Sequence, residues 1–112
     1  MGIVAGGDDD ETSGAERWLV IDGRRWRRTD PALPPDVVSA LTSHLGRARS
    51  AVRTARRPGA DPDALADARA RVDLAKHGLG ERGPYWWDRP VGERRDAALS
   101  ALAELEALTN HR

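Results

Sequence analysis

The sequence predicts a mainly α-helical fold: three helices, the first two forming an antiparallel pair, with an N-terminal two-stranded β-hairpin packed on them. Three observations predict it. Apolar residues recur at intervals of three and four over residues 35–57, 62–79 and 90–108. Proline and glycine interrupt the chain between these stretches. An apolar run, an Asp-Gly pair and a second aromatic-bearing run precede them, which is typical of a hairpin.

The predicted hairpin lies in "RWLVIDGRRWRR", residues 17–28. Asp22-Gly23 is a favoured pair for a two-residue type I′ turn, which sets Leu19 opposite Trp26. Because side chains alternate along a strand, the hairpin has two faces. An isolated hairpin is marginal in water, so one face must pack on the helices. We expect that core face to be Leu19, Ile21 and Trp26. The opposite face presents Trp18, Val20, Arg25 and Arg27.

The ends of the predicted helices follow from proline, glycine and acidic residues. Pro58-Gly59 ends the first helix, and Asp61-Pro62 begins the second with an N-cap acid and a proline at the first helical position. With so short a connection, these two helices are expected to be antiparallel. The third helix is expected to present a leucine seam to the core, formed by Leu99, Leu102, Leu105 and Leu108.

Charge is unevenly placed along a chain whose formal net charge is zero. Residues 1–16 have a formal charge of −5 and no aromatic residue, so we expect a disordered acidic tail. A single small domain is expected over residues 17–109. Within it, residues 17–57 are arginine-rich, with a charge of +7, whereas residues 58–112 have a charge of −2. The positive half suits nucleic acid or another polyanion.

Residue types that the chain lacks exclude several function classes. It has no cysteine, which excludes a disulfide framework, a thiolate nucleophile and a cysteine zinc site. No apolar run approaches about 18 residues, and the opening residues lack the basic and apolar segments of a signal peptide. We therefore expect a cytoplasmic protein with no membrane partner.

Two arginine groups form the candidate nucleic-acid-binding site. In the hairpin, Trp18 would stack on an unpaired base while arginines neutralise phosphates. The structural alternative is that Arg25 and Arg27 lie over Trp18 as cation–π contacts. In the first helix, the alternative is a solvated face paired with Asp63 and Asp67. The candidate residues are Trp18, Arg25, Arg27, Arg28, Arg49 and Arg53. By their spacing, one helix face carries Arg49, Arg53, Arg56 and Arg57.

The second unusual stretch is "GLGERGPYWWDRP", residues 78–90. Its glycines match a loose G-x-G-x-x-G pattern, but they follow a helix, whereas dinucleotide binding needs the pattern between a strand and a helix. We expect a tight turn in which Glu81 pairs with Arg82, while Trp86 and Trp87 plug the junction between hairpin and helices. The alternative is a groove for a peptide or small ligand. The residues of this ligand site or structural turn are Glu81, Arg82, Tyr85, Trp86 and Trp87.

Two segments of the chain resemble a known family. "RWLVIDGRRWRRTDPALP" and "ARVDLAKHGLGERGPYWW" are similar to segments of a family of small uncharacterised bacterial proteins. The family patterns are R-W-x-V-x-D-G-R-R-W-R-x-T-D-P and A-K-x-x-L-G-E-R-G-x-x-W-W, and the similarity covers most of residues 17–88. Some members are labelled biopolymer transporters, a role that the lack of a membrane segment disfavours. The resemblance implies a shared fold and transfers no activity or catalytic residue.

The remaining residues give little support to catalytic or metal chemistry. His44 is expected near His77 and Asp73 in the antiparallel pair, but their spacing matches no metal-site motif, and packing histidines are the simpler interpretation. Lys76, the only lysine, suggests Schiff-base chemistry, yet no pocket is predicted around it and a helix-end cation is simpler. We therefore expect no metal, no cofactor and no enzymatic activity. An enzyme would need a pocket lined by Glu81, Arg82, Tyr85 and Trp86.

These patterns together predict a non-enzymatic binding module of one of two kinds. In the first, the arginine-rich half binds nucleic acid or another polyanion, and the acidic tail competes for that surface. In the second, the chain is a protein–protein interaction or assembly module. Its helical surfaces would then pack on a protein partner, or on a second copy of the chain in a homodimer.

Overall fold

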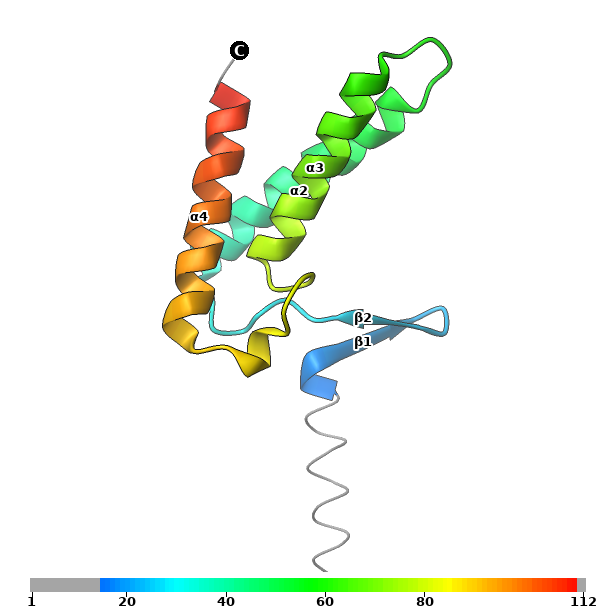
Figure 1. Ribbon diagram of the computed structural model, residues 1–112. Coiled ribbons are helices and arrows are strands. Elements are labelled where there is room, and N and C mark those ends of the chain that lie inside the picture. Colours follow the sequence, from blue (N-terminus) through cyan, green and yellow to red (C-terminus); the bar gives the residue numbers. More distant parts are fainter. Residues whose placement is uncertain (1–14, 111–112) are drawn as a thin grey trace, which may run out of the picture.

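The computed structural model describes residues 15–110. Most of the predicted acidic tail lies outside the described residues, and its last two residues, Ala15 and Glu16, are helical. The elements that follow are β1 (Trp18–Ile21), β2 (Arg24–Arg27), α2 (Pro35–Ala55), α3 (Pro62–Gly78), the 3-10 turn η1 (Trp86–Asp88) and α4 (Val91–Asn110) (Figure 1).

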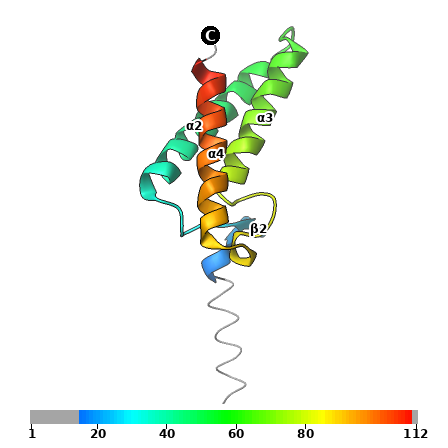
Figure 2. The same cartoon turned by 60° about the vertical axis from the view of Figure 1, so that its left-hand side comes forward.

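The long helices and the hairpin have the predicted arrangement. α2 and α3 run antiparallel and pack on each other, and α4 packs mainly against α3 (Figure 1). The hairpin lies near the end of the helices where α3 ends and α4 begins, whereas the α2–α3 loop lies at the opposite end (Figures 1 and 2). Within residues 15–110, no helix is long and apolar enough to cross a membrane.

Local sequence explains where the helices begin. Pro35 occupies the first turn of α2, and Asp36 in that turn is favourable at the positive end of the helix dipole. The Asp61 carboxylate accepts a hydrogen bond from the amide of Asp63, 2.9 Å away, and so caps α3 as the sequence predicts. α2 ends at Ala55, two residues before the predicted end, with Arg56 as its C-cap.

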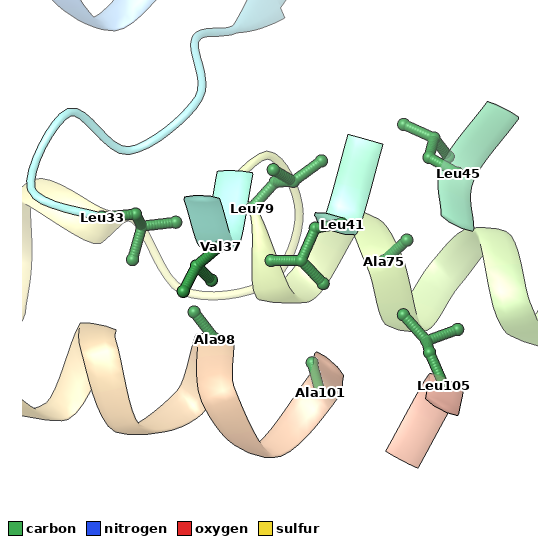
Figure 3. Close-up of a cluster of buried hydrophobic side chains, with 9 residues drawn as sticks. All are labelled: Leu33, Val37, Leu41, Leu45, Ala75, Leu79, Ala98, Ala101 and Leu105. Atoms are coloured by element: carbon green, nitrogen blue, oxygen red, sulfur yellow. The ribbon is translucent and has the colours of Figure 1, made fainter. Parts of the chain in front are cut away.

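The hydrophobic core lies where the three helices meet (Figure 3). It combines leucines with small residues: Leu33, Val37, Leu41, Leu45, Ala75, Leu79, Ala98, Ala101 and Leu105. Small residues allow α3 and α4 to approach closely, since a Cβ added at Gly78 would lie only 2.9 Å from the Cβ of Ala101. Burial of each large side chain stabilises the fold by about 1.5–3 kcal/mol.

The predicted leucine seam of α4 is partly wrong. Leu105 is fully buried and Leu102 is half-buried, but Leu99 and Leu108 are exposed. Ala98 and Ala101 take the core positions instead. The buried face of α4 is therefore formed by Ala98, Ala101 and Leu105, and α4 approaches α3 closely where Ala101 faces Gly78.

The hairpin has the predicted register but packs through the other face. Trp18 pairs with Arg27 and Leu19 with Trp26, and the positive φ angles of Asp22 (53°) and Gly23 (78°) suit a type I′ turn. The expected core face is wrong, because no residue of the hairpin joins the buried helical core. Leu19, Ile21 and Trp26 are 36%, 53% and 40% exposed.

Hydrogen bonds near the helix ends attach the segment that follows the hairpin. The Asp30 amide donates to the carbonyl of Leu79 (2.9 Å), and the indole Nε1 of Trp86 donates to the carbonyl of Arg28 (3.0 Å). Arg94 of α4 holds the Asp30 carboxylate through its Nε (2.8 Å) and one terminal nitrogen (2.6 Å). The segment that follows the hairpin is therefore attached by polar contacts to the end of α3, to Trp86 and to the start of α4.

Candidate functional site

Trp18 lies in an aromatic cluster between β1 and the segment before α4. Its ring meets Tyr85 and Trp87 edge to face, with ring centroids 5.9 and 5.6 Å away, and these two rings stack on each other at 4.6 Å. The guanidinium of Arg25 lies over the Trp18 ring, 4.1 Å from its centroid. This cation–π contact was the structural alternative for the hairpin, and it occupies one face of the ring that would stack on a base.

Arg27 makes a different contact from the one expected. Its guanidinium lies over Tyr85, 4.6 Å from the ring centroid, and not over Trp18. One terminal nitrogen donates to the carbonyls of Gly80 (3.1 Å) and Pro84 (3.2 Å), which fixes the turn after α3. Arg28 turns the other way, and its Nε donates to the carbonyl of Ala15.

The turn after α3 has partners other than those expected. Glu81 and Arg82 do not pair with each other, so that prediction is wrong. Glu81 accepts a hydrogen bond from the Thr29 hydroxyl (2.6 Å), and Arg82 bridges to Asp73 of α3 (3.0 Å). Adjacent side chains on this turn therefore point to different neighbours, one toward the hairpin connector and the other back along α3.

The two tryptophans of the turn have separate roles. Trp86 is 8% exposed and fills the junction between the hairpin connector and the helices, as predicted. Gly80 permits this, because its φ is +78° and an added Cβ would lie 3.1 Å from the Trp86 ring. Trp87 is half-buried and belongs to the aromatic cluster with Trp18.

An open groove of about 470 Å³ lies between α2 and α3, and we call it the arginine groove. Its lining residues are Arg49, Val52, Arg53, Arg56, Arg69, Val72 and Arg82. None of the described residues that line it is acidic. The expected pairing of the α2 arginines with Asp63 and Asp67 is not found among the salt bridges of residues 15–110. Instead, α3 adds a further guanidinium, that of Arg69.

A second opening of about 330 Å³ lies between the hairpin and the helices, and we call it the hairpin cleft. Its apolar wall is the face that was expected to pack on the core. Its lining residues are Leu19, Ile21, Trp26, Arg27, Thr29, Arg49, Lys76 and Glu81. Arg49 lines both the hairpin cleft and the arginine groove, so the two openings adjoin.

Lys76 faces this cleft, which corrects the expectation that no pocket surrounds it. It lies in the last turn of α3 as predicted, but it is only 8% exposed, and its Nζ lies 5.3 Å from the ring centroid of Trp26. Burial lowers the pKa of its ammonium; Glu81 opposes this shift, and Arg49 and Arg82 add to it.

The histidines do not form a shared site. His44 lines a cavity of about 230 Å³ with Arg47 and Arg71, and burial together with Arg47 lowers its pKa. His77 lines a different opening, together with Leu74 and Leu108, and its Nδ1 is 2.8 Å from the carbonyl oxygen of Asp73. Within residues 15–110, no group of three or more His, Asp or Glu residues is placed to hold a metal ion.

Comparisons of the chain with protein-family models, with curated proteins and with solved structures give no match. The resemblance of its two motifs to an uncharacterised bacterial family therefore stays a prediction. Of the predicted nucleic-acid-binding residues, Arg49 and Arg53 share the arginine groove. Trp18, Arg25 and Arg27 belong instead to the contacts around the hairpin.

Proposed function

We propose that this protein binds single-stranded nucleic acid through the arginine groove. The observation that carries the proposal is the convergence of five guanidinium groups, from α2, α3 and the turn after α3, on one opening without an acidic lining residue. Guanidinium groups bind phosphate oxygens in a bidentate manner and stay charged at any physiological pH. Arg82 is paired with Asp73, but no salt bridge within residues 15–110 includes the other four, so an anion in the groove would reduce their mutual repulsion.

The spacing of the arginines supports an extended anion rather than a single one. Arg49, Arg53 and Arg56 follow one another at intervals of four and three, which places about one guanidinium on each turn, or about every 5.4 Å of the α2 axis. Val52 of α2 and Val72 of α3 also line the groove and offer apolar surface to sugars or bases. A single strand lying along α2 would therefore meet both positive charge and apolar surface.

In this proposal the hairpin has a supporting role. Trp18 is half-buried and covered by Arg25, so base stacking on its ring would require that arginine to move. The exposed guanidinium groups of the hairpin still contribute positive potential near the groove, and such potential raises the rate of association with polyanions.

The test compares two arginines of the same segment. Arg53 lines the groove, whereas Arg57, also exposed, does not. Binding of a fluorescently labelled mixed single-stranded oligonucleotide is measured by anisotropy at several salt concentrations. We expect R53Q to weaken binding and to reduce the slope of log K against log salt by about 0.7, the value for one phosphate contact on a single strand. R57Q removes the same charge and should change the slope little.

Two outcomes would contradict the proposal. The first is that the unaltered protein does not bind the oligonucleotide even at low salt. The second is that R53Q and R57Q weaken binding equally, which would mean that net charge alone, and not the groove, attracts the strand.

A second candidate function, an assembly module, is supported by a different surface. Leu99 and Leu108 of α4 are 51% and 43% exposed, and Leu108 lines an opening with Leu74 of α3. Exposed leucines along a helix are typical of surfaces that pack on a partner helix. Sedimentation velocity over rising protein concentration tests for a homodimer. L108E should abolish any concentration-dependent increase, and its absence in the unaltered protein would count against this function.

A further inference from the structure

The hairpin cleft has two chemically different sides. The hairpin supplies an apolar wall of Leu19, Ile21 and Trp26, which the helical core leaves uncovered. The helices supply cations: the ammonium of Lys76 from α3 and the guanidinium of Arg49 from α2. Its volume of about 330 Å³ is at the small end of the range for pockets that bind small molecules.

The cations of the cleft outnumber the acids that could neutralise them. Glu81 is the one carboxylate among the lining residues, and it is already hydrogen-bonded to the Thr29 hydroxyl. None of the three salt bridges within residues 15–110 includes Lys76. Burial partly desolvates the Lys76 ammonium, so an anion in the cleft would stabilise its charged form.

We propose that the hairpin cleft is a binding site for a small carboxylate with an apolar body, whose carboxylate lies between Lys76 and Arg49 and whose apolar part packs on Leu19, Ile21 and Trp26. This site is distinct from the arginine groove in both its ligand and its residues, apart from Arg49. Its test uses no nucleic acid, so its failure would leave the proposed function untouched.

The chemistry of both sides selects this ligand class. A neutral apolar molecule would fit the wall but offer no charge to the ammonium of Lys76, which takes part in none of the salt bridges within residues 15–110. A free inorganic anion would satisfy the ammonium but leave the apolar wall exposed to water. A molecule with a single carboxylate on a hydrocarbon body satisfies both, because charge-assisted hydrogen bonds at one end add to hydrophobic contact at the other.

Protonation of Lys76 should be linked to binding. Its pKa is lowered by burial and by the facing charges of Arg49 and Arg82, whereas Glu81 raises it; Arg27 is a further cation of the cleft lining. A bound carboxylate favours the charged ammonium and should raise this pKa. By linkage, the ligand then binds more weakly as the pH rises through the pKa of Lys76, because the neutral amine offers no charge.

The experiment uses the fact that the chain has one lysine. The full-length protein, labelled with ¹³C at lysine, is titrated with octanoate while the Cε signal of Lys76 is followed by NMR. We expect a saturable shift, and a pH titration of the same signal should give a higher pKa with octanoate bound. Octanol, which matches the hydrocarbon but lacks the charge, should bind about ten-fold more weakly, as expected for loss of a charge-assisted hydrogen bond.

Substitutions test the cationic side and the apolar side of the hairpin cleft in turn, and they distinguish the hairpin cleft from the arginine groove. K76M keeps the apolar stem and should weaken octanoate binding about ten-fold or more when followed by calorimetry, whereas K76R keeps the charge and should retain most of it. I21S should weaken the binding of octanoate, whose hydrocarbon part packs on the apolar wall, but leave the binding of acetate unchanged. R53Q is the matched control, because Arg53 lines only the arginine groove and its loss should not change octanoate affinity.

The proposal is overturned if octanoate gives no saturable shift of the Lys76 signal up to its solubility limit. It is also overturned if octanol binds as tightly as octanoate, or if folded K76M, confirmed by its thermal melt, binds octanoate as well as the unaltered protein does.

Discussion

The Asp30 carboxylate is 2% exposed and joins three parts of the chain. It accepts hydrogen bonds from the amide of Ala32 (2.9 Å) and from two nitrogens of Arg94, whose side chain is 11% exposed. The Arg94 guanidinium also lies 5.2 Å from the ring centroid of Trp86. One buried ion pair thus holds together the hairpin connector, the start of α4 and the turn that contains Trp86.

Removing one partner of this pair should destabilise the fold strongly. We expect R94M to lower the free energy of unfolding by about 3–5 kcal/mol, because it leaves the Asp30 carboxylate buried without its counter-charge. Urea denaturation followed by circular dichroism measures the loss. D30N combined with R94M should cost less than the sum of the two single changes. Additive losses would show that the two side chains do not interact.

Both the backbone conformation at position 80 and the side chains around it favour glycine there. Its φ is +78°, and an added Cβ would lie 3.0 Å from the Cβ of Asp30. Gly59 has a similar φ of +85°, but nothing lies within 4 Å of its added Cβ. Both G80A and G59A should cost about 1–2 kcal/mol for the left-handed backbone. G80A should cost about 1–3 kcal/mol more, because the Asp30 and Trp86 side chains must shift. Equal losses of unfolding free energy in the two variants would mean that the site accommodates a methyl group.

For the helices and strands, features that depend on neighbouring residues are predicted better than features that depend on packing against distant parts of the chain. The Asp22-Gly23 turn determines the hairpin register, and Asp61 with Pro62 determines the start of α3, so both follow from neighbouring residues in the sequence. Which face of an element is buried depends on distant partners. The hairpin packs through Trp18 and Arg27 because Tyr85 and the carbonyl of Gly80 lie there, more than 50 residues along the chain.

In the candidate site, too, some features depend on neighbouring residues and others on distant packing. Helical spacing alone placed Arg49 and Arg53 on one face of α2. The contribution of Arg69 depends on how α3 is rotated against α2, which the sequence pattern does not specify. One feature of the sequence draws attention to Lys76, because it is the only lysine of the chain. Its cleft could not be predicted, because the cleft exists only where the hairpin's apolar face stands off from the helices.

The attachment of the hairpin to the helices depends on its aromatic side. We expect W18A to increase the hydrogen-exchange rates of the β1 and β2 amides, because the ring contacts with Tyr85 and Trp87 hold the hairpin in place. The amides of α2 and α3 should change little. V20A is the control, since Val20 is 70% exposed. Hairpin exchange rates in W18A no higher than those in V20A would argue against the cluster as the anchor.

The net charge of the molecule is zero, but its positive and negative charges are concentrated in different segments of the chain. Residues 17–57 carry +7, whereas residues 1–16 carry −5 on a segment rich in aspartate, glutamate and glycine. We propose that the acidic segment competes with polyanions for the arginine groove. Such an interaction between opposite charges is screened by salt, with a Debye length of about 10 Å at 0.1 M ionic strength, so its effect should be largest at low salt.

Neutralising the acidic segment in the full-length chain tests this competition. Replacement of Asp8, Asp9, Asp10 and Glu11 by their amides keeps the length and removes four negative charges. We expect oligonucleotide affinity at low salt to rise by about ten-fold, as for a competing interaction of about 1.4 kcal/mol, and the gain to disappear at high salt. In the R53Q background the gain should shrink, because the groove itself is weakened. A gain of the same size in that background would show that the acidic segment acts through net charge and does not compete for the groove.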